Sequence, residues 1–314
     1  MRKLLIGSLT IVLAGAVLWA LPEPPGRGTA NAATDPVIAA AGDIACDPST
    51  AHTATACHQA ETAALLTAGS YDAVLPLGDQ QYECGAASAY QASYDPTWGQ
   101  VKAISHPVPG DNEYAGKTCT TPNASGYFNY FGSAAGTAGQ GWYSYDLGSW
   151  HVIALNSECS QIGGCGGTSP QGKWLKADLA AHPNSRYPCT LVYWHRPRFG
   201  DNGSGFAGAK WMFKQLYNKG ADVLLNGHAH LYERFAPQNP SGALDTAKGI
   251  REFIVGTGGR NHAKLAATPP PNSEVRQNTT FGILRLTLHA GGYDWQFIPE
   301  AGKTFTDSGS GSCH

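Results

Sequence analysis

The 314-residue sequence predicts an α/β fold in which strands deliver the side chains of one site. Short apolar runs recur along the chain, and segments with helical spacing separate several of them. Five short motifs each couple an oxygen or imidazole donor to a glycine or to the end of an apolar run. These motifs are Gly42-Asp43, Gly78-Asp79-Gln80-Gln81-Tyr82, Gly110-Asp111-Asn112-Glu113, Val192-Tyr193-Trp194-His195 and Gly227-His228-Ala229-His230. Because α/β folds place their sites in loops at the carboxyl ends of strands, this mixture of donors predicts a two-metal site.

The apolar runs predict strands, and helical spacing predicts the helices between them. In chain order, strands are expected at residues 36–41, 73–77, 143–147, 151–156, 190–194, 222–225, 251–255, 282–288 and 293–297. Helices are expected at 57–68, at one or two places within 87–104, at 171–181 and at 208–218. The chain has no internal repeat and no interdomain linker, so residues 33–314 are expected to form a single catalytic domain.

The N-terminus has the features of an export signal that covers residues 1–32. Arg2 and Lys3 provide the positive start, residues 4–21 are apolar, and Ala30-Asn31-Ala32 offers a cleavage site. The apolar run is nearly long enough to span a bilayer, so an uncleaved anchor is the alternative. The proline-rich segment 22–25 favours cleavage. We therefore expect a secreted protein without stable membrane association after cleavage.

Eight cysteines agree with an oxidising compartment, because an even number in an exported chain argues for disulfides. Cys159 and Cys165 enclose a short, flexible loop that closes easily. The other expected pairs, which the sequence cannot prove, are Cys46–Cys57, Cys84–Cys119 and Cys189–Cys313. A thiolate metal site is the alternative, and the absence of a Cys-x-x-Cys pair disfavours it.

Charge is sparse in this chain: charged residues make up 14%, the net charge is −2, and no long run has one sign. A surface that binds nucleic acid would need a basic stripe. The composition therefore indicates no nucleic-acid partner, and it leaves the oligomeric state open.

At its five motifs the chain resembles the calcineurin-like metallophosphoesterases, and among them the purple acid phosphatase branch. That branch carries Gly-Asp-x-Gly, Gly-Asp-x-x-Tyr, Gly-Asn-His-Asp/Glu, Val-x-x-His and Gly-His-x-His in this order. The match spans residues 43–230, and the tail Leu231-Tyr232-Glu233-Arg234 strengthens it. The resemblance implies a metallophosphoesterase four-layer αββα sandwich of two mixed β-sheets flanked by helices.

Ala45 and Tyr82 favour the purple branch. Most metallophosphoesterases have Asp-x-His at the first motif, but here Ala45, which cannot ligate, occupies the histidine position. Tyr82 supplies the missing donor as a phenolate, a hard anion that favours Fe(III). The resemblance thus implies two metal ions, Fe(III) with Fe, Zn or Mn. The first takes Asp43, Asp79, Tyr82 and His230, and the second takes Asp79 as a bridge, Asp111, His195 and His228.

The third motif departs from the family at Asp111 and Asn112, where the family has an Asn ligand and a catalytic His. Asp111 still offers an oxygen ligand. Asn112 can contact a phosphate oxygen but cannot transfer a proton, and such transfer typically contributes about 10²–10⁴-fold in rate. Arg196, next to His195, is a candidate phosphate clamp, and His262 is a candidate substitute acid.

These residues predict hydrolysis of small phosphate esters by a metal-activated hydroxide. Phosphate monoesters are the expected substrates because of the resemblance. A phosphodiesterase is the nearest alternative, because Asp111 makes the site neutral and a diester carries less charge. A metal-bearing binding protein that has lost turnover through the change at Asn112 is the alternative from another class.

Overall fold

Two mixed β-sheets form the framework of the computed structural model, which describes residues 1, 35–116, 119–201 and 205–314. Among these residues, the smaller sheet has the strand order β12-β11-β10-β1-β2 and the larger sheet β3-β4-β5-β6-β8-β7-β9. The smaller sheet comprises β1 (Val37–Ala41), β2 (Ala73–Pro76), β10 (Gly282–His289), β11 (Gly292–Pro299) and β12 (Ser308–Ser312). The larger sheet comprises β3 (Tyr143–Leu147), β4 (Trp150–Ala154), β5 (Cys189–Tyr193), β6 (Val223–Asn226), β7 (Tyr232–Phe235), β8 (Arg251–Val255) and β9 (Ser273–Gln277).

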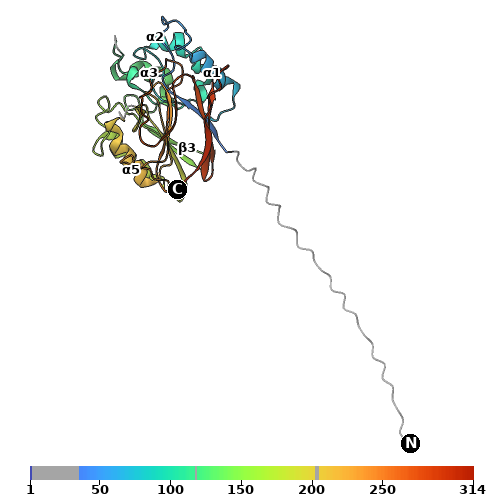
Figure 1. Ribbon diagram of the computed structural model, residues 1–314. Coiled ribbons are helices and arrows are strands. Elements are labelled where there is room, and N and C mark those ends of the chain that lie inside the picture. Colours follow the sequence, from blue (N-terminus) through green and yellow to red (C-terminus); the bar gives the residue numbers. More distant parts are fainter. Residues whose placement is uncertain (2–34, 117–118, 202–204) are drawn as a thin grey trace. The chain divides into compact units, whose positions relative to one another are not determined.

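Helices cover the outer faces of the two sheets, and Figure 1 shows α5 on the far side of the strands from α1. The α-helices are α1 (Gln59–Ala68), α2 (Ala87–Ala89), α3 (Ser125–Phe131), α4 (Pro170–Ala181) and α5 (Lys210–Lys219). The side chains of α1 pack with the core that contains the smaller sheet. Those of α4 and α5 form a second core against β5 and β6 of the larger sheet. These layers confirm the predicted αββα sandwich.

Parallel pairing brings the predicted donors to one edge of the framework. β1 pairs with β2 in parallel, and β4, β5, β6 and β8 form a parallel set in the other sheet. Parallel strands end at the same edge of a sheet, so the residues that follow them meet there. Asp43 follows β1, Asp79 follows β2, His195 follows β5 and His228 follows β6. Both faces of β1 are buried, which explains its small apolar sequence, Val-Ile-Ala-Ala-Ala.

The predicted strands and helices are present, with ends that differ by at most two residues from the expected ones. The region 87–104 divides into α2, a π-helix at Tyr90–Tyr94 and a 3₁₀ helix at Trp98–Ile104. Among the described residues, one further α-helix, α3, and three further strands, β7, β9 and β12, were not predicted, nor were several short 3₁₀ helices. The sequence of β12 is Ser-Gly-Ser-Gly-Ser, which has no apolar pattern, and the strand forms only by pairing with β11 at the edge of its sheet.

The eight cysteines form the four predicted disulfides, Cys46–Cys57, Cys84–Cys119, Cys159–Cys165 and Cys189–Cys313. The last of these joins β5 to the segment after β12. Asp35 pairs with His289 at 2.7 Å, and the Cys313 N–H donates to the carbonyl of Gly291 at 3.0 Å. Both ends of residues 35–314 therefore lie beside the turn between β10 and β11.

No helix within the described ranges is long and apolar enough to cross a membrane. The predicted signal, residues 1–32, lies outside the described residues apart from Met1. Its cleavage stays a prediction.

Candidate metal centre

Asp43, Tyr82 and His230 form one half of the predicted donor set. The Tyr82 hydroxyl lies 3.0 Å from Asp43 Oδ1 and 3.1 Å from His230 Nε2. His230 Nε2 also lies 3.1 Å from Asp43 Oδ1. The other ring nitrogen of His230, Nδ1, contacts Asn261 Oδ1 at 2.9 Å, so Asn261 orients the ring with Nε2 toward the donors.

Asp79, the predicted bridging ligand, contacts residues of both halves of the site. Its Oδ2 accepts a hydrogen bond from the Tyr82 hydroxyl at 2.9 Å, and its Oδ1 lies 3.4 Å from His195 Nε2. Asn112 fixes the same carboxylate from the other side. The Asn112 backbone N–H donates to Oδ1 at 2.8 Å, and its side-chain amide donates to Oδ2 at 2.7 Å.

Asp111, His195 and His228 form the other half. Asp111 Oδ1 lies 3.1 Å from His195 Nε2 and 3.0 Å from His228 Nδ1. The two imidazole nitrogens are 3.2 Å apart. The Nδ1–H of His195 donates to the carbonyl of Leu77 at 2.8 Å, which turns Nε2 toward the site. The structure thus brings all seven predicted metal ligands together.

The backbone at these motifs is strained in a way that aims the donors inward. Asp43, Asp79 and His228 have φ angles of 59°, 49° and 69°. Residues other than glycine rarely adopt this left-handed conformation, which costs on the order of 1–3 kcal/mol each, and such strain gathers at functional sites. The glycine of the second motif makes room for a ligand, because a Cβ at Gly78 would lie 2.4 Å from His195 Nδ1.

Burial and neighbouring charges set the protonation of the donors. Burial, together with Asp43 and Asp79, raises the pKa of Tyr82 well above its usual value. Burial alone would lower the pKa of His195, but Asp79 and Asp111 outweigh it and hold that pKa well above the usual value. Burial also opposes ionisation of Asp111, yet hydrogen bonds from His195 and His228 lower its pKa. Opposite charges thus compensate each other here, and bound cations would take over the positive role.

The donor set fits two metal ions. Asp43, Asp79 and His195 offer ligand atoms within 4.8 Å of one another, and so do Asp111, His195 and His228. Carboxylate, phenolate and imidazole donors suit Fe(III) with a divalent partner.

Arg196, the predicted phosphate clamp, is held by two carboxylates. Its Nε donates to Glu158 Oε1 at 2.8 Å, and its second terminal nitrogen lies 3.3 Å from Asp111 Oδ2. The first terminal nitrogen lies 3.3 Å from His228 Nε2. Arg196 therefore buttresses the second half of the site, and its charge is already compensated.

A cavity of about 480 Å³ opens beside the donors. Its wall consists of Asp79, Tyr82, Glu83, Asp111, Asn112, Ala115, Gly116, His228, His230, Arg260 and Asn261. Arg260 and Asn261 were missing from the sequence predictions. They follow Gly256-Thr257-Gly258-Gly259 after β8, at the same edge as the other donors. Their place after a central parallel strand is the signal that would have found them.

Glu113, the last residue of the third motif, had no predicted role. This buried carboxylate accepts backbone N–H groups from Asp79 at 2.8 Å, Gln80 at 2.9 Å and Gly110 at 2.7 Å. It thereby fastens the second Gly-Asp motif to the third.

His262, the candidate substitute acid, does not line the cavity. Its ring stacks on Phe281 with centroids 3.9 Å apart. Burial lowers the pKa of His262 to about 4, so the ring is neutral above that pH and has no acidic proton to give.

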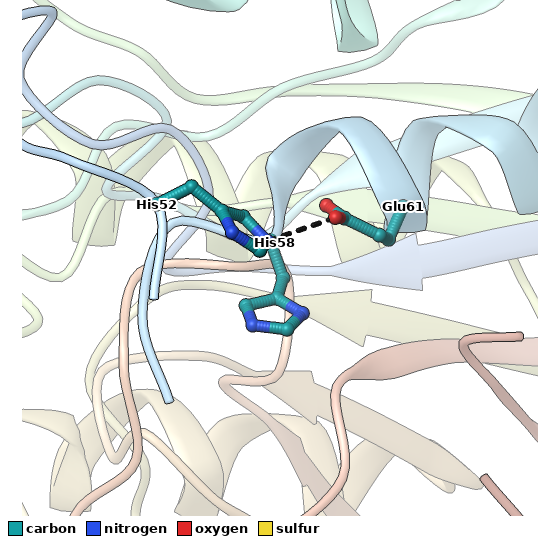
Figure 2. Close-up of side chains that lie close together, drawn as sticks. All are labelled: His52, His58 and Glu61. Carbon is teal, nitrogen blue, oxygen red and sulfur yellow. Dashed lines mark ion pairs between the residues drawn. The ribbon is translucent and has the colours of Figure 1, made fainter. Parts of the chain in front are cut away.

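Figure 2 shows a separate group of ligand-type side chains, His52, His58 and Glu61, at the start of α1. His52 Nε2 pairs with Glu61 Oε1 at 2.9 Å on the surface. Both ring nitrogens of His58 are engaged, Nδ1 by Glu300 at 2.5 Å and Nε2 by the carbonyl of Thr53 at 2.8 Å. Because His58 has no free nitrogen, we assign this group to the local hydrogen-bond network.

Comparison with known proteins agrees with the resemblance in the motifs. The chain is 32% identical over 167 residues to purple acid phosphatase 22 of Arabidopsis thaliana, covering 48% of this chain and 35% of that protein. It is 26% identical over 253 residues to acid phosphatase type 7 of Homo sapiens, covering 70% of this chain and 56% of that protein. The chain thus spans only about a third to a half of the length of these relatives. No protein-family model matches it.

The fold is also that of a known structure. The purple acid phosphatase PPD1 isolated from yellow lupin (Lupinus luteus) seeds aligns with a TM-score of 0.69 at 18% identity, over 88% of this chain and 53% of that one. The chain is therefore similar in sequence to purple acid phosphatases, as its motifs predict, and it shares the fold of one of them.

Proposed function

We propose that this protein is a binuclear-metal phosphoesterase that hydrolyses phosphate monoesters. The observation that carries the proposal is the convergence of seven donors, from five separate segments, beside a cavity that five of them line. The relatives named acid phosphatases support the reaction class. Asp43, Asp79, Tyr82 and His230 would hold the first ion, and Asp79, Asp111, His195 and His228 the second.

When bound, two such cations supply the nucleophile and neutralise the phosphoryl oxygens. The residues of the chain orient the ligands and the substrate. Asn261 and the Leu77 carbonyl hold His230 and His195 with the correct nitrogen inward. Asn112 restrains Asp79 and presents a neutral amide to the cavity, so it can orient a substrate but cannot protonate a leaving group. Esters with good leaving groups are therefore the expected favourable substrates.

A phosphodiesterase is the second candidate, and Asp111 is the observation that favours it. This third carboxylate makes the centre less cationic than an asparagine would, and Arg196 is already compensated by Glu158. A diester carries one negative charge per phosphate, so it depends less on positive charge in the site.

The test is turnover of p-nitrophenyl phosphate and bis-p-nitrophenyl phosphate by the purified, metal-analysed protein. Asp79→Ala should abolish turnover and lower metal content, whereas the exposed Asp294→Ala on β11 should change neither. Faster hydrolysis of the first ester supports a phosphatase, and faster hydrolysis of the second a diesterase. A fully metallated protein that turns over neither ester would be a binding protein on an enzyme's scaffold.

We further propose that residues 1–32 direct export and are removed. The four disulfides support an oxidising compartment. Amino-terminal sequencing of protein from the culture medium tests this, because a first residue near 33 is expected.

A further inference from the structure

The cavity beside the donors is lined by more than the predicted metal ligands. Five of those ligands line it, and the remaining lining residues are Asn112, Glu83, Ala115, Gly116, Arg260 and Asn261. Its volume of about 480 Å³ is in the range of small-molecule sites and leaves room for more than a phosphate group. Arg260 is the one arginine or lysine among the described residues that line the cavity, so it can supply a permanent positive charge to an anionic substrate.

The guanidinium of Arg260 lies close to the predicted ligands. Its central carbon is 5.0 Å from the centroid of the Tyr82 ring. The adjacent residue, Asn261, contacts His230. The backbone is fixed as well, since the Arg260 N–H donates to the carbonyl of Asp43 at 2.9 Å and its carbonyl accepts from Cys57 at 3.2 Å. The backbone of Arg260 is therefore held in place by hydrogen bonds beside the predicted metal centre.

Most donors of this guanidinium lack a strong acceptor. One terminal nitrogen lies 3.2 Å from Glu83 Oε1, and the other only contacts the sulfur of Cys46 at 3.8 Å. The buried Nε has no hydrogen-bond partner in the described part of the chain. A guanidinium has five N–H donors in a planar fork that matches phosphate oxygens. Arg260 thus keeps hydrogen-bonding capacity that its present contacts do not use.

Arg260 differs in this respect from Arg196. Glu158 and Asp111 both hold Arg196, which is absent from the cavity wall. Within the described part of the chain, Arg260 forms an ion pair with one carboxylate, that of Glu83, whose side chain is 25% exposed, and the charge of Asp47 acts on it from farther away. A purely structural ion pair would account for the contact with Glu83, but it would not require the unused donors or the position in the wall.

We propose that Arg260 binds the non-bridging oxygens of the substrate phosphate and selects monoesters over diesters. This inference rests on the proposed phosphoesterase function. A phosphate monoester carries close to two negative charges above pH 6, whereas a diester carries one. Because Asp111 lowers the positive charge of the centre, a guanidinium beside the predicted ligands contributes most to binding the more highly charged substrate.

The test compares Arg260→Gln, Arg260→Lys and the control Arg285→Gln, which removes an arginine on β10 outside the cavity wall. For Arg260→Gln, kcat/KM on p-nitrophenyl phosphate should fall about 10- to 100-fold, and on bis-p-nitrophenyl phosphate less than about threefold. Arg260→Lys should recover part of the loss, and Arg285→Gln should match the wild type. Equal losses on both esters, or no loss, would overturn the proposal.

Calorimetric binding of inorganic phosphate to the metallated proteins separates this inference from the proposed function. If the wild type hydrolyses neither ester, the proposed function fails. In that case, the phosphate-binding role of Arg260 is still supported if Arg260→Gln binds phosphate at least about tenfold more weakly than the wild type. An unchanged phosphate affinity would refute that role. Metal content is measured for every variant. If Arg260→Gln loses metal, Arg260→Lys is used in its place. An Arg260→Lys variant whose ester selectivity and phosphate affinity equal those of Arg285→Gln would overturn the proposal.

Discussion

Asn112 is the residue at which the site departs furthest from its relatives' pattern. Its backbone and side-chain N–H groups both donate to Asp79, so Asn112 fixes the orientation of the predicted bridging carboxylate. It has no proton to transfer, and His262, which lies outside the wall, does not replace it. For the proposed hydrolysis, we therefore expect a rate that depends on the leaving group.

A histidine at position 112 should restore the missing acid. We expect Asn112→His to raise kcat on an alkyl phosphate by about tenfold or more, with little change on p-nitrophenyl phosphate, which needs no protonation. Steady-state kinetics on both esters measure this. If the wild type and Asn112→His hydrolyse the alkyl phosphate at equal rates and with equal metal content, another group already supplies the proton.

Tyr82 should give the iron-loaded protein its colour. Replacing it by Phe removes only the hydroxyl, so the fold should persist while the visible absorption band of an iron–phenolate disappears. Tyr145→Phe on β3 is the matched control and should keep the band. Absorption spectra with iron analysis decide the matter, and a band that survives in Tyr82→Phe would remove this residue from the ligand set.

The donors themselves were predictable from sequence because each stands in a short local motif. Arg260, Asn261 and the role of Glu113 were not. They contact His230, Asp43 and Asp79, which lie 31, 217 and 34 positions away, and only the folded sheet edges bring those together. Sequence patterns report local spacing, whereas these roles arise from tertiary contacts.

At the scale of elements, Glu113 joins two loops that each carry a ligand. Glu113→Gln would place an amide NH₂ against the backbone N–H groups that the carboxylate accepts. Because buried donors left without an acceptor cost about 1–3 kcal/mol each, we expect a loss of about 2 kcal/mol or more in unfolding free energy, with reduced metal content. Denaturant unfolding measures it, with Glu61→Gln, a partly exposed glutamate on α1 outside the site, as control. Equal stability of the two variants would contradict the assignment.

Strands with an apolar or alternating run were predictable, and three strands with a short, mixed or polar sequence (β7, β9 and β12) were not. β12 has the sequence Ser-Gly-Ser-Gly-Ser, so only its hydrogen bonds to β11 define it. β7 and β9 pair with each other at one side of the larger sheet, and β9 has a mostly part-exposed, polar sequence. Such strands depend on their neighbours more than on hydrophobic periodicity.

At the scale of the whole molecule, the disulfides differ greatly in the loop they close. Cys189–Cys313 spans 124 residues and Cys159–Cys165 spans 6. Since a longer loop loses more entropy on closure, replacing the first pair by serines should cost about 2–4 kcal/mol, and more than replacing the second. Denaturant unfolding of the two double variants gives the order, and a reversed order would contradict the entropic argument.

Glu252 should make the whole fold sensitive to pH. It is buried on β8, its Oε1 accepts the Arg198 N–H at 2.7 Å, and burial raises its pKa from 4.5 to about 8. The folded state therefore holds a proton that the unfolded state releases, so stability falls as pH rises from 4.5 through about 8.

Replacing Glu252 by glutamine removes that titration. Between pH 5 and pH 8, the thermal midpoint of the wild type should fall more than that of Glu252→Gln, with Glu61→Gln behaving like the wild type. Calorimetric scans at the two pH values provide the comparison. Parallel profiles for the wild type and Glu252→Gln would refute the role of Glu252.

Both ends of residues 35–314 lie beside the turn between β10 and β11, near the amino end of β1. Asp43, in contrast, follows the carboxyl end of β1. Anything anchored to either end, such as a resin bead, an affinity tag or a fused carrier protein, is therefore held away from the cavity. The same feature makes oriented immobilisation possible: a surface that grips the chain by its ends would leave the reacting side open to the surrounding solution.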